Sequence, residues 1–207
     1  MVTADVEIKI CGLTNRDDAA AALGAGADYL GFVLYAESPR GIRATQLRRI
    51  LDKAGEIRNA VGVFVNRPRA EVLKIAEDCG LCAVQIHGDE AAEEFKDMPL
   101  PVWRALRLKG GECIPEPSAW PAERYVADAS APGLYGGTGL KTDWTAAAAL
   151  ARSRKVMLAG GLTPENVADA VRTVRPAGVD VAGGVEQLPG RKDRRKIEAF
   201  IRAARSA

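Results

Sequence analysis

The chain has 207 residues, of which 47% are hydrophobic and 27% are charged, and its formal net charge is +2. This balance is typical of a soluble globular protein, and so small a charge gives no electrostatic reason to expect a nucleic acid or a membrane as partner. No segment reaches the roughly 18 consecutive apolar residues that a membrane span needs. The first residues, MVTADVEIKI, lack the basic-then-apolar order of a signal peptide, so we expect a cytoplasmic protein.

Four cysteines, Cys11, Cys79, Cys82 and Cys113, are expected to be free thiols in that reducing compartment. Cys79 and Cys82 have the C-x-x-C spacing, but one such pair with a single histidine in the chain does not make a zinc site. We therefore expect no metal, and we interpret this pair as the end of a helix followed by the start of a strand.

Eight short apolar segments recur along the chain and predict buried strands. Most are continuous apolar runs, which is typical of parallel strands covered on both faces. They span residues 6–11, 29–34, 60–65, 83–87, 102–108, 124–129, 155–159 and 178–182.

Helix-like segments lie between the strands, with apolar residues on one face of each. The faces are Leu47, Ile50 and Leu51; Val72, Ile75, Ala76 and Cys79; Val167, Ala170, Val171 and Val174; and Ile197, Phe200, Ile201 and Ala204. Thr14 with Asp17 resembles a capping box, and Gly80 is placed to end a helix. The basic run 191–196 is interpreted as the solvated start of the last helix. Residues 109–123, with three prolines and two glycines, predict a loop or a short irregular turn.

Eight strands alternating with about eight helices predict one (β/α)8 TIM barrel over residues 1–207. The alternative is a doubly wound open sheet, which usually has its phosphate loop after the first strand. Here glycine pairs follow the seventh and eighth strands, where barrels of this type commonly bind phosphate. Glycine permits a positive φ and lets backbone N–H groups approach an anion closely. The candidate phosphate-binding residues are therefore Gly160, Gly161, Gly183 and Gly184.

Reactive groups of a barrel lie at the carboxyl ends of its strands. Cys11 ends the first strand, either as a small buried hydrophobe or as a thiol that faces a ligand. To act as a base at neutral pH, the thiol would need a modestly lowered pKa, to which Arg40 could contribute. Asp128 ends the sixth strand, where partial desolvation would raise its pKa and let it donate a proton. The alternative for Asp128 is an N-cap or a loop-ordering role.

Three further polar residues lie at strand ends or in the loops that follow. His87, the only histidine, is either a general base or a structural residue. Arg40 is placed to bind a carboxylate or a phosphate, or else is an exposed loop cation. Asp180 either contacts a substrate hydroxyl or is tied to neighbouring backbone.

The chain resembles the phosphoribosylanthranilate isomerase family of tryptophan biosynthesis. The matching segments are KICGLTNRDDA, GADYLGFVLYAESPRGI, VGVFVN, VQIHGDE, GGTGLKTDW, LAGGLTPENV and GVDVAGGVEQLPGRKDRRKI. They occur in order over nearly the whole chain, whereas residues 109–123 contribute little.

This resemblance implies a cofactor-free Amadori rearrangement, an aldose–ketose isomerisation of a phosphorylated small molecule. By similarity, Asp128 is the general acid that opens the furanose ring, and Cys11 is the general base that removes the C2′ proton. Arg40 would hold the anthranilate carboxylate, the two glycine loops would hold the phosphate, and the glycine-rich segment 133–139 would cover the site. The resemblance leaves open whether the chain is a monomer or a homodimer.

Three positions, in two segments, depart from the family pattern. Ala182 and Gly183 stand where family members commonly have two serines, so phosphate contacts worth about 1–3 kcal/mol would be missing and backbone N–H groups would dominate. Thr142 replaces the usual aromatic residue.

Two other functions remain as alternatives. One is a different phosphate-binding barrel, such as a sugar-phosphate epimerase or a lyase. A metal-dependent epimerase would need several histidines, and the chain has one. The other is a barrel that binds its ligand without turnover, against which Cys11 and Asp128 argue.

Overall fold

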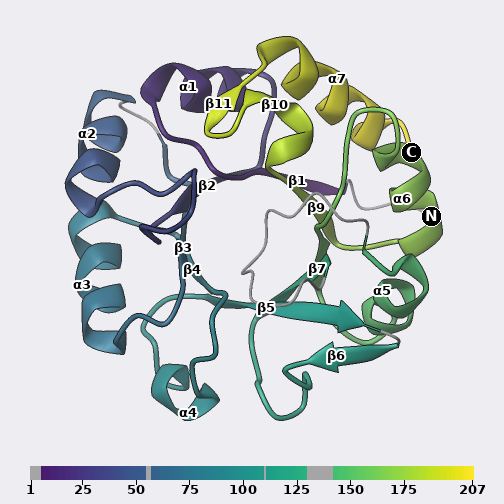
Figure 1. The fold of residues 1–207 in the computed structure, drawn as a ribbon, viewed down its shortest axis with the longest axis horizontal. Coiled ribbons are helices and arrows are strands. Elements are labelled where there is room, and N and C mark those ends of the chain that lie inside the picture. Colours follow the sequence, from purple (N-terminus) through teal and green to yellow (C-terminus); the bar gives the residue numbers. More distant parts are fainter. Residues whose placement is uncertain (1–5, 55–56, 110, 130–141) are drawn as a thin grey trace.

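Eight parallel strands form a closed barrel in the computed structural model, which describes residues 6–54, 57–109, 111–129 and 142–207 (Figure 1). The strands are β1 (Glu7–Ile10), β2 (Tyr29–Val33), β3 (Ala60–Phe64), β4 (Ala83–Ile86), β5 (Val102–Lys109), β7 (Arg124–Ala129), β8 (Val156–Leu158) and β9 (Gly178–Val181). The ring is closed because β1 pairs with both β2 and β9, and β4 pairs with β5. The predicted barrel is confirmed, and each predicted strand overlaps one strand of the ring.

Helices surround the ring on its outer side (Figure 1). They are α1 (Arg16–Gly24), α2 (Ala44–Ala54), α3 (Arg69–Cys79), α4 (Ala92–Phe95), α5 (Trp144–Ala151), α6 (Val167–Val174) and α7 (Arg194–Arg205). The apolar faces predicted for α2, α3, α6 and α7 pack on the strands. Within the described residues, no helix has the length and apolar character to cross a membrane.

The segment after β5 differs from the prediction. Instead of a loop or an irregular turn alone, residues Glu112–Ile114 form β6, which pairs antiparallel with β5 outside the ring. No helix follows β5 in the described part of this segment. Trp120 covers the barrel here: it is buried, its indole N–H donates to the Glu90 carbonyl at 2.9 Å, and the Arg104 guanidinium lies 5.0 Å from its ring centre. One aromatic side chain thus buries apolar surface that a helix covers elsewhere.

Local signals at helix ends were partly right. Asn15, not Thr14, caps α1: its side chain accepts from the Asp18 N–H and donates to the Asp18 carboxylate, both at 2.9 Å. The Thr14 hydroxyl instead donates to the Gly190 carbonyl, which joins the first loop to the last one. Gly80 ends α3 in the left-handed conformation, as predicted.

The end of the chain after β9 completes the rim of the barrel. A short 3-10 helix, η1 (Gly183–Val185), leads into a hairpin of β10 (Glu186–Leu188) and β11 (Arg191–Lys192). Figure 1 shows this hairpin beside the loops at the end of β1, so segments from both ends of the sequence meet at the mouth.

Candidate active site

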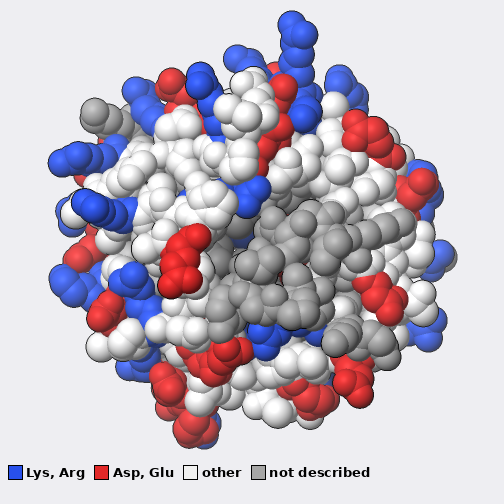
Figure 2. Space-filling view, viewed as in Figure 1, with Lys and Arg blue, Asp and Glu red and all other residues white. Residues whose placement is uncertain are grey.

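A cavity of about 680 Å³ opens at the carboxyl ends of the strands. Figure 2 shows acidic and basic side chains mixed around the edge of this face, with no large area of one sign. All nine predicted site residues line it, namely Cys11, Arg40, His87, Asp128, Gly160, Gly161, Asp180, Gly183 and Gly184. The segment 133–139, predicted to cover the site, lies outside the described residues.

Cys11 directly follows β1 and is 8% exposed. Burial raises the pKa of its thiol, and the ammonium of Lys9 opposes that shift. A base at neutral pH would need a lowered pKa, a direction that the sequence leaves open; in the unliganded chain, desolvation outweighs the nearby positive charge. The thiol is therefore protonated at neutral pH before the substrate binds.

Asp128 lies near the end of β7, where its carboxylate accepts the Ala129 N–H at 2.8 Å. Desolvation is the main reason that its pKa rises to about 6, and the negative charge of Asp180 adds to the shift. This agrees with the expectation of a raised pKa. A carboxyl group with such a pKa is suited to donating a proton near neutral pH.

His87 lies between Asp128 and a pair of residues that the sequence did not single out. Burial, together with the positive charge of Lys9, lowers the pKa of His87 to about 3, so the ring is neutral and a poor general base at neutral pH. Its Nδ1 lies 3.2 Å from the Gln85 amide nitrogen, and its Nε2 lies 3.7 Å from the Asp128 carboxylate. Gln85 in turn accepts a hydrogen bond from Lys9 at 3.0 Å.

Asp180, on β9, is held by one of its two oxygens. Oδ2 pairs with the Lys9 ammonium at 2.9 Å, whereas Oδ1 is buried and has no hydrogen-bond partner among the described residues. Contact with neighbouring backbone was one of two expectations for this residue, but its observed partner is a side chain. Asp180 lines the cavity, and Oδ1 is the oxygen whose hydrogen-bonding capacity the described residues leave unused, although its surface is buried in the unliganded chain.

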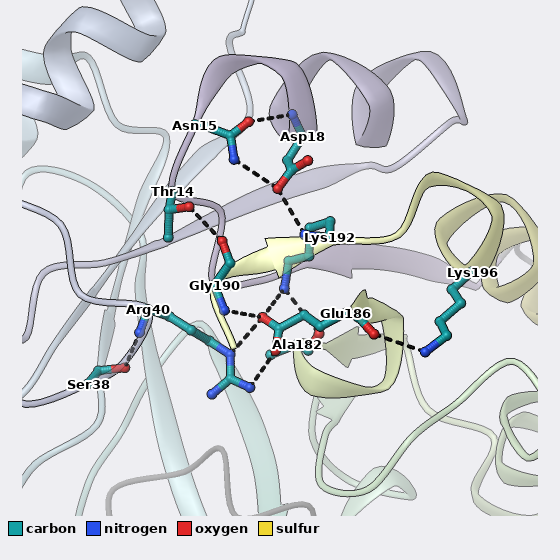
Figure 3. A network of polar contacts seen from close by, with 10 residues as sticks. All are labelled: Thr14, Asn15, Asp18, Ser38, Arg40, Ala182, Glu186, Gly190, Lys192 and Lys196. Atoms are coloured by element: carbon teal, nitrogen blue, oxygen red, sulfur yellow. Dashed lines mark hydrogen bonds and ion pairs between the residues drawn. The ribbon is translucent and has the colours of Figure 1, made fainter. Parts of the chain in front are cut away.

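Arg40 is buried rather than an exposed loop cation. Figure 3 shows its guanidinium against Glu186, to which Nε and Nη2 donate at 2.8 and 2.7 Å. Glu186 also accepts from Lys192 at 2.9 Å, and Lys192 donates to the Ala182 carbonyl at 3.0 Å. Lys192 is 4% exposed, so the prediction of a solvated basic run is wrong at this position. The ion pair fixes the direction of the guanidinium, and none of the residues with a described position bonds to Nη1, which is left for a ligand.

The two glycine loops pack against each other. A Cβ on Gly184 would lie 1.9 Å from the Leu162 carbonyl oxygen, so only glycine fits where the loop after β9 meets the loop after β8. A Cβ on Gly160, which has φ +81°, would lie 2.1 Å from the Thr142 hydroxyl. Gly183 begins η1, and the first N–H groups of a helix have no partner within it. The loops can therefore turn backbone donors toward an anion in the cavity.

The arrangement suits acid–base chemistry on a phosphorylated molecule. Within the described part of the chain, no cluster of three or more His, Cys, Asp or Glu side chains is placed to hold a metal ion.

The family model for N-(5′-phosphoribosyl)anthranilate (PRA) isomerase matches residues 8–203. The chain belongs to this family. A family member from Trichlorobacter lovleyi is 43% identical over 98% of this chain and 99% of its own length. One from Pseudomonas fluorescens is 46% identical over 97% and 98%. Among solved members, that from Thermotoga maritima has a TM-score of 0.89 at 36% identity, over 98% of this chain and 100% of its own. The resemblance read from the sequence motifs is thus confirmed.

Proposed function

We propose that this chain converts N-(5′-phosphoribosyl)anthranilate into 1-(2-carboxyphenylamino)-1-deoxyribulose 5-phosphate, with Asp128 as general acid and Cys11 as general base. The observation that most supports this is the pair itself: a carboxyl group whose pKa is about 6 and a buried thiol line one cavity. In the ring, β8 and β9 separate β7 from β1. The acid and the base therefore flank the two glycine loops.

The first step opens the furanose ring. Protonated Asp128 gives its proton to the ring oxygen as the bond from C1′ to that oxygen breaks. The lone pair of the anthranilate nitrogen forms the C=N bond of a protonated Schiff base. A carboxyl group with a pKa of about 6 keeps enough of its protonated form near neutral pH to do this.

The second step moves the double bond. The active form of the enzyme is the one in which the Cys11 thiol has released its proton to solvent while Asp128 has kept its own. The Cys11 thiolate of this form takes the C2′ proton, the released electron pair forms the C1′=C2′ bond, and the C=N electrons return to nitrogen. The resulting enolamine tautomerises: C1′ gains a proton and the C2′ hydroxyl loses one. No proton is gained or lost overall, and no oxidant, reductant or cofactor is consumed.

Three groups would hold the substrate while this happens. The phosphate would accept hydrogen bonds from backbone N–H groups of the two glycine loops, since Ala182 and Gly183 supply no hydroxyl. Arg40 would bind the anthranilate carboxylate through Nη1, and Asp180 would accept a sugar hydroxyl with Oδ1. A related solved isomerase is described as a complex with reduced 1-(o-carboxyphenylamino)-1-deoxyribulose 5-phosphate, a ligand with the same three kinds of group.

The setting that fits this function is a single catalytic domain in the cytoplasm, acting as a monomer or a homodimer. All four cysteines are free thiols, which suits a reducing compartment. A relative from Thermotoga maritima is described through monomers generated from a dimeric enzyme, so both assembly states occur around this fold.

A turnover assay tests the proposal. Freshly made N-(5′-phosphoribosyl)anthranilate is mixed with the protein, and the loss of anthranilate-type fluorescence is followed. Wild type should turn over, whereas Cys11→Ala and Asp128→Asn should each lower kcat by about 10²–10⁴-fold. Cys113→Ala, on β6 outside the barrel, is the matched control and should stay at the wild-type rate. An inactive wild type would refute the function, and fully active variants would refute the roles.

A further inference from the structure

We propose that Lys9 is a positioning residue that holds a positive charge against the base Cys11, and that Gln85 and His87 extend its influence to the acid Asp128. One buried chain of polar contacts would then link the two groups that exchange protons with the substrate. The inference rests on the proposed function and adds residues to which no role has been given.

Lys9 is fully buried inside the barrel, which is a costly place for an ammonium group. Its Nζ donates to Gln85 Oε1 on β4 at 3.0 Å and to Asp180 Oδ2 on β9 at 2.9 Å. An ammonium has three protons, so one remains beyond these two bonds. The Cys11 thiol is its neighbour: a Cβ built on Gly31 would lie 2.7 Å from Cys11 Sγ and 2.9 Å from Lys9 Cε, so the two side chains lie side by side over Gly31. A methionine would fill the same space without the desolvation cost, so packing alone does not account for a lysine here.

The contacts of Gln85 fix which nitrogen of His87 carries the proton. Since Gln85 Oε1 accepts from Lys9, its amide nitrogen faces His87 Nδ1 as a donor, at 3.2 Å. A neutral imidazole that accepts at Nδ1 carries its proton on Nε2. That N–H faces the Asp128 carboxylate, 3.7 Å away, and a shift of less than an ångström would make it a hydrogen bond.

The order of events explains why both ends benefit. Once Asp128 has given its proton to the sugar, it is a carboxylate, and the Nε2–H of His87 stabilises that form. Lys9 favours the Cys11 thiolate that must next remove the C2′ proton, and it keeps its own proton because Asp180 holds it. Neither Lys9 nor His87 gives or takes a proton in this scheme.

Other charges also face these groups, and the test must separate them from Lys9. Cys11 is influenced by Lys9, Asp180, Arg40 and Lys192; Asp128 by Lys9 and Asp180; and His87 by Lys9, Arg104 and Arg107. Lys9 is the charge common to all three sets.

The direct experiment measures the thiolate without any substrate. Cys11 alkylation by iodoacetamide is followed against pH, with the Cys11 peptide quantified by mass spectrometry. Lys9→Met should move the profile at least one pH unit upward, which is about a tenfold lower rate at a fixed pH below the new pKa. Lys74→Met, the same change on the exposed face of α3, is the matched control and should leave the profile unchanged.

A second variant guards against misfolding. Lys9→Met leaves Asp180 as a buried carboxylate without its partner, so the double variant Lys9→Met/Asp180→Asn removes both charges together. Its profile should also move upward relative to the single variant Asp180→Asn. An unchanged Cys11 alkylation profile in folded Lys9→Met would overturn the role of Lys9. So would identical profiles for the double variant and for Asp180→Asn.

The extension to the acid has its own readout. In Gln85→Leu, nothing from Gln85 keeps the proton on Nε2 of His87, so the Asp128 carboxylate loses a stabilising N–H. The rise of kcat/KM on the acid side of its pH profile should then move to higher pH, while KM stays within about threefold of the wild-type value. A wild-type acid limb in this variant would overturn the link through Gln85. Because the alkylation needs no substrate, it distinguishes failure of this inference from failure of the proposed function. A wild type without turnover would refute the proposed function. An active wild type, with Lys9 variants whose Cys11 alkylation profile is unchanged, would refute this inference alone.

Discussion

Replacing Asp128 by asparagine should stabilise the fold at neutral pH while removing most of the activity. The side chain is 8% exposed, and burial raises its pKa from an ordinary 3.8 to about 6. Two pKa units correspond to about 3 kcal/mol of unfavourable free energy in the folded state once the carboxyl group is ionised. The general acid is thus held in place at a cost in stability.

The sign of the pH dependence follows from the direction of the shift. The folded chain binds the Asp128 proton more tightly than the unfolded chain does, so this group's stabilising contribution is complete below its unfolded pKa. That contribution disappears as the pH rises through the folded pKa of about 6. His87, whose lowered pKa gives the opposite slope, is present in both proteins, so the comparison reports the change at Asp128 together with its effect on His87.

The assay is urea unfolding followed by circular dichroism, for wild type and Asp128→Asn at pH 4 and pH 8. The wild-type free energy of unfolding minus that of the variant should fall by about 2–3 kcal/mol between these two values. Asp169→Asn, on the exposed face of α6, is the matched control and should change this difference by less than about 1 kcal/mol. A constant difference across the range, or one that rises with pH, would refute the buried-acid reasoning.

Three further outcomes are expected. The profile of kcat/KM against pH should be bell-shaped, because in the active form the acid and the base together carry one proton. Activity should rise with pH around the Asp128 pKa of about 6, and a rise centred below pH 5 would contradict this assignment. Gly184→Ala should raise KM more than tenfold with little change in kcat, because the new Cβ would meet the Leu162 oxygen and push the two glycine loops apart. An unchanged inhibition constant for inorganic phosphate in this variant would contradict phosphate binding by these loops. Glu186→Gln should raise KM about 3–30-fold by freeing Arg40 to rotate, and a lowered KM in the same assay would show that Glu186 competes with the substrate instead.

The fold could be predicted because its signals are local. Continuous apolar runs mark strands buried on both faces, and Gly80 marks a helix end from one residue type alone. The segment 109–123 was poorly predicted because β6 exists only through its pairing with β5, and because Trp120 covers the barrel through contacts with residues far away in sequence. Such contacts leave no periodic pattern.

The site was predictable to the same extent. All nine candidates reach one cavity because parallel strands end at the same rim. Lys9 was missed although a signal existed: it lies two residues before Cys11 on a strand, hence on the same face, in an otherwise apolar run. The partners Glu186 and Lys192 depend on a hairpin that folds back on itself, and the direction of the Cys11 pKa depends on how deeply the thiol is buried. Neither can be obtained from spacing.

A crystal structure with reduced 1-(o-carboxyphenylamino)-1-deoxyribulose 5-phosphate tests the central claim most directly. We expect Cys11 Sγ in contact with C2′, the Asp128 carboxyl group within hydrogen-bond distance of the former ring oxygen, and the phosphate on N–H groups of Gly161 and Gly183. A sugar bound with Cys11 and Asp128 both away from these atoms, or a phosphate gripped chiefly by side chains, would contradict it.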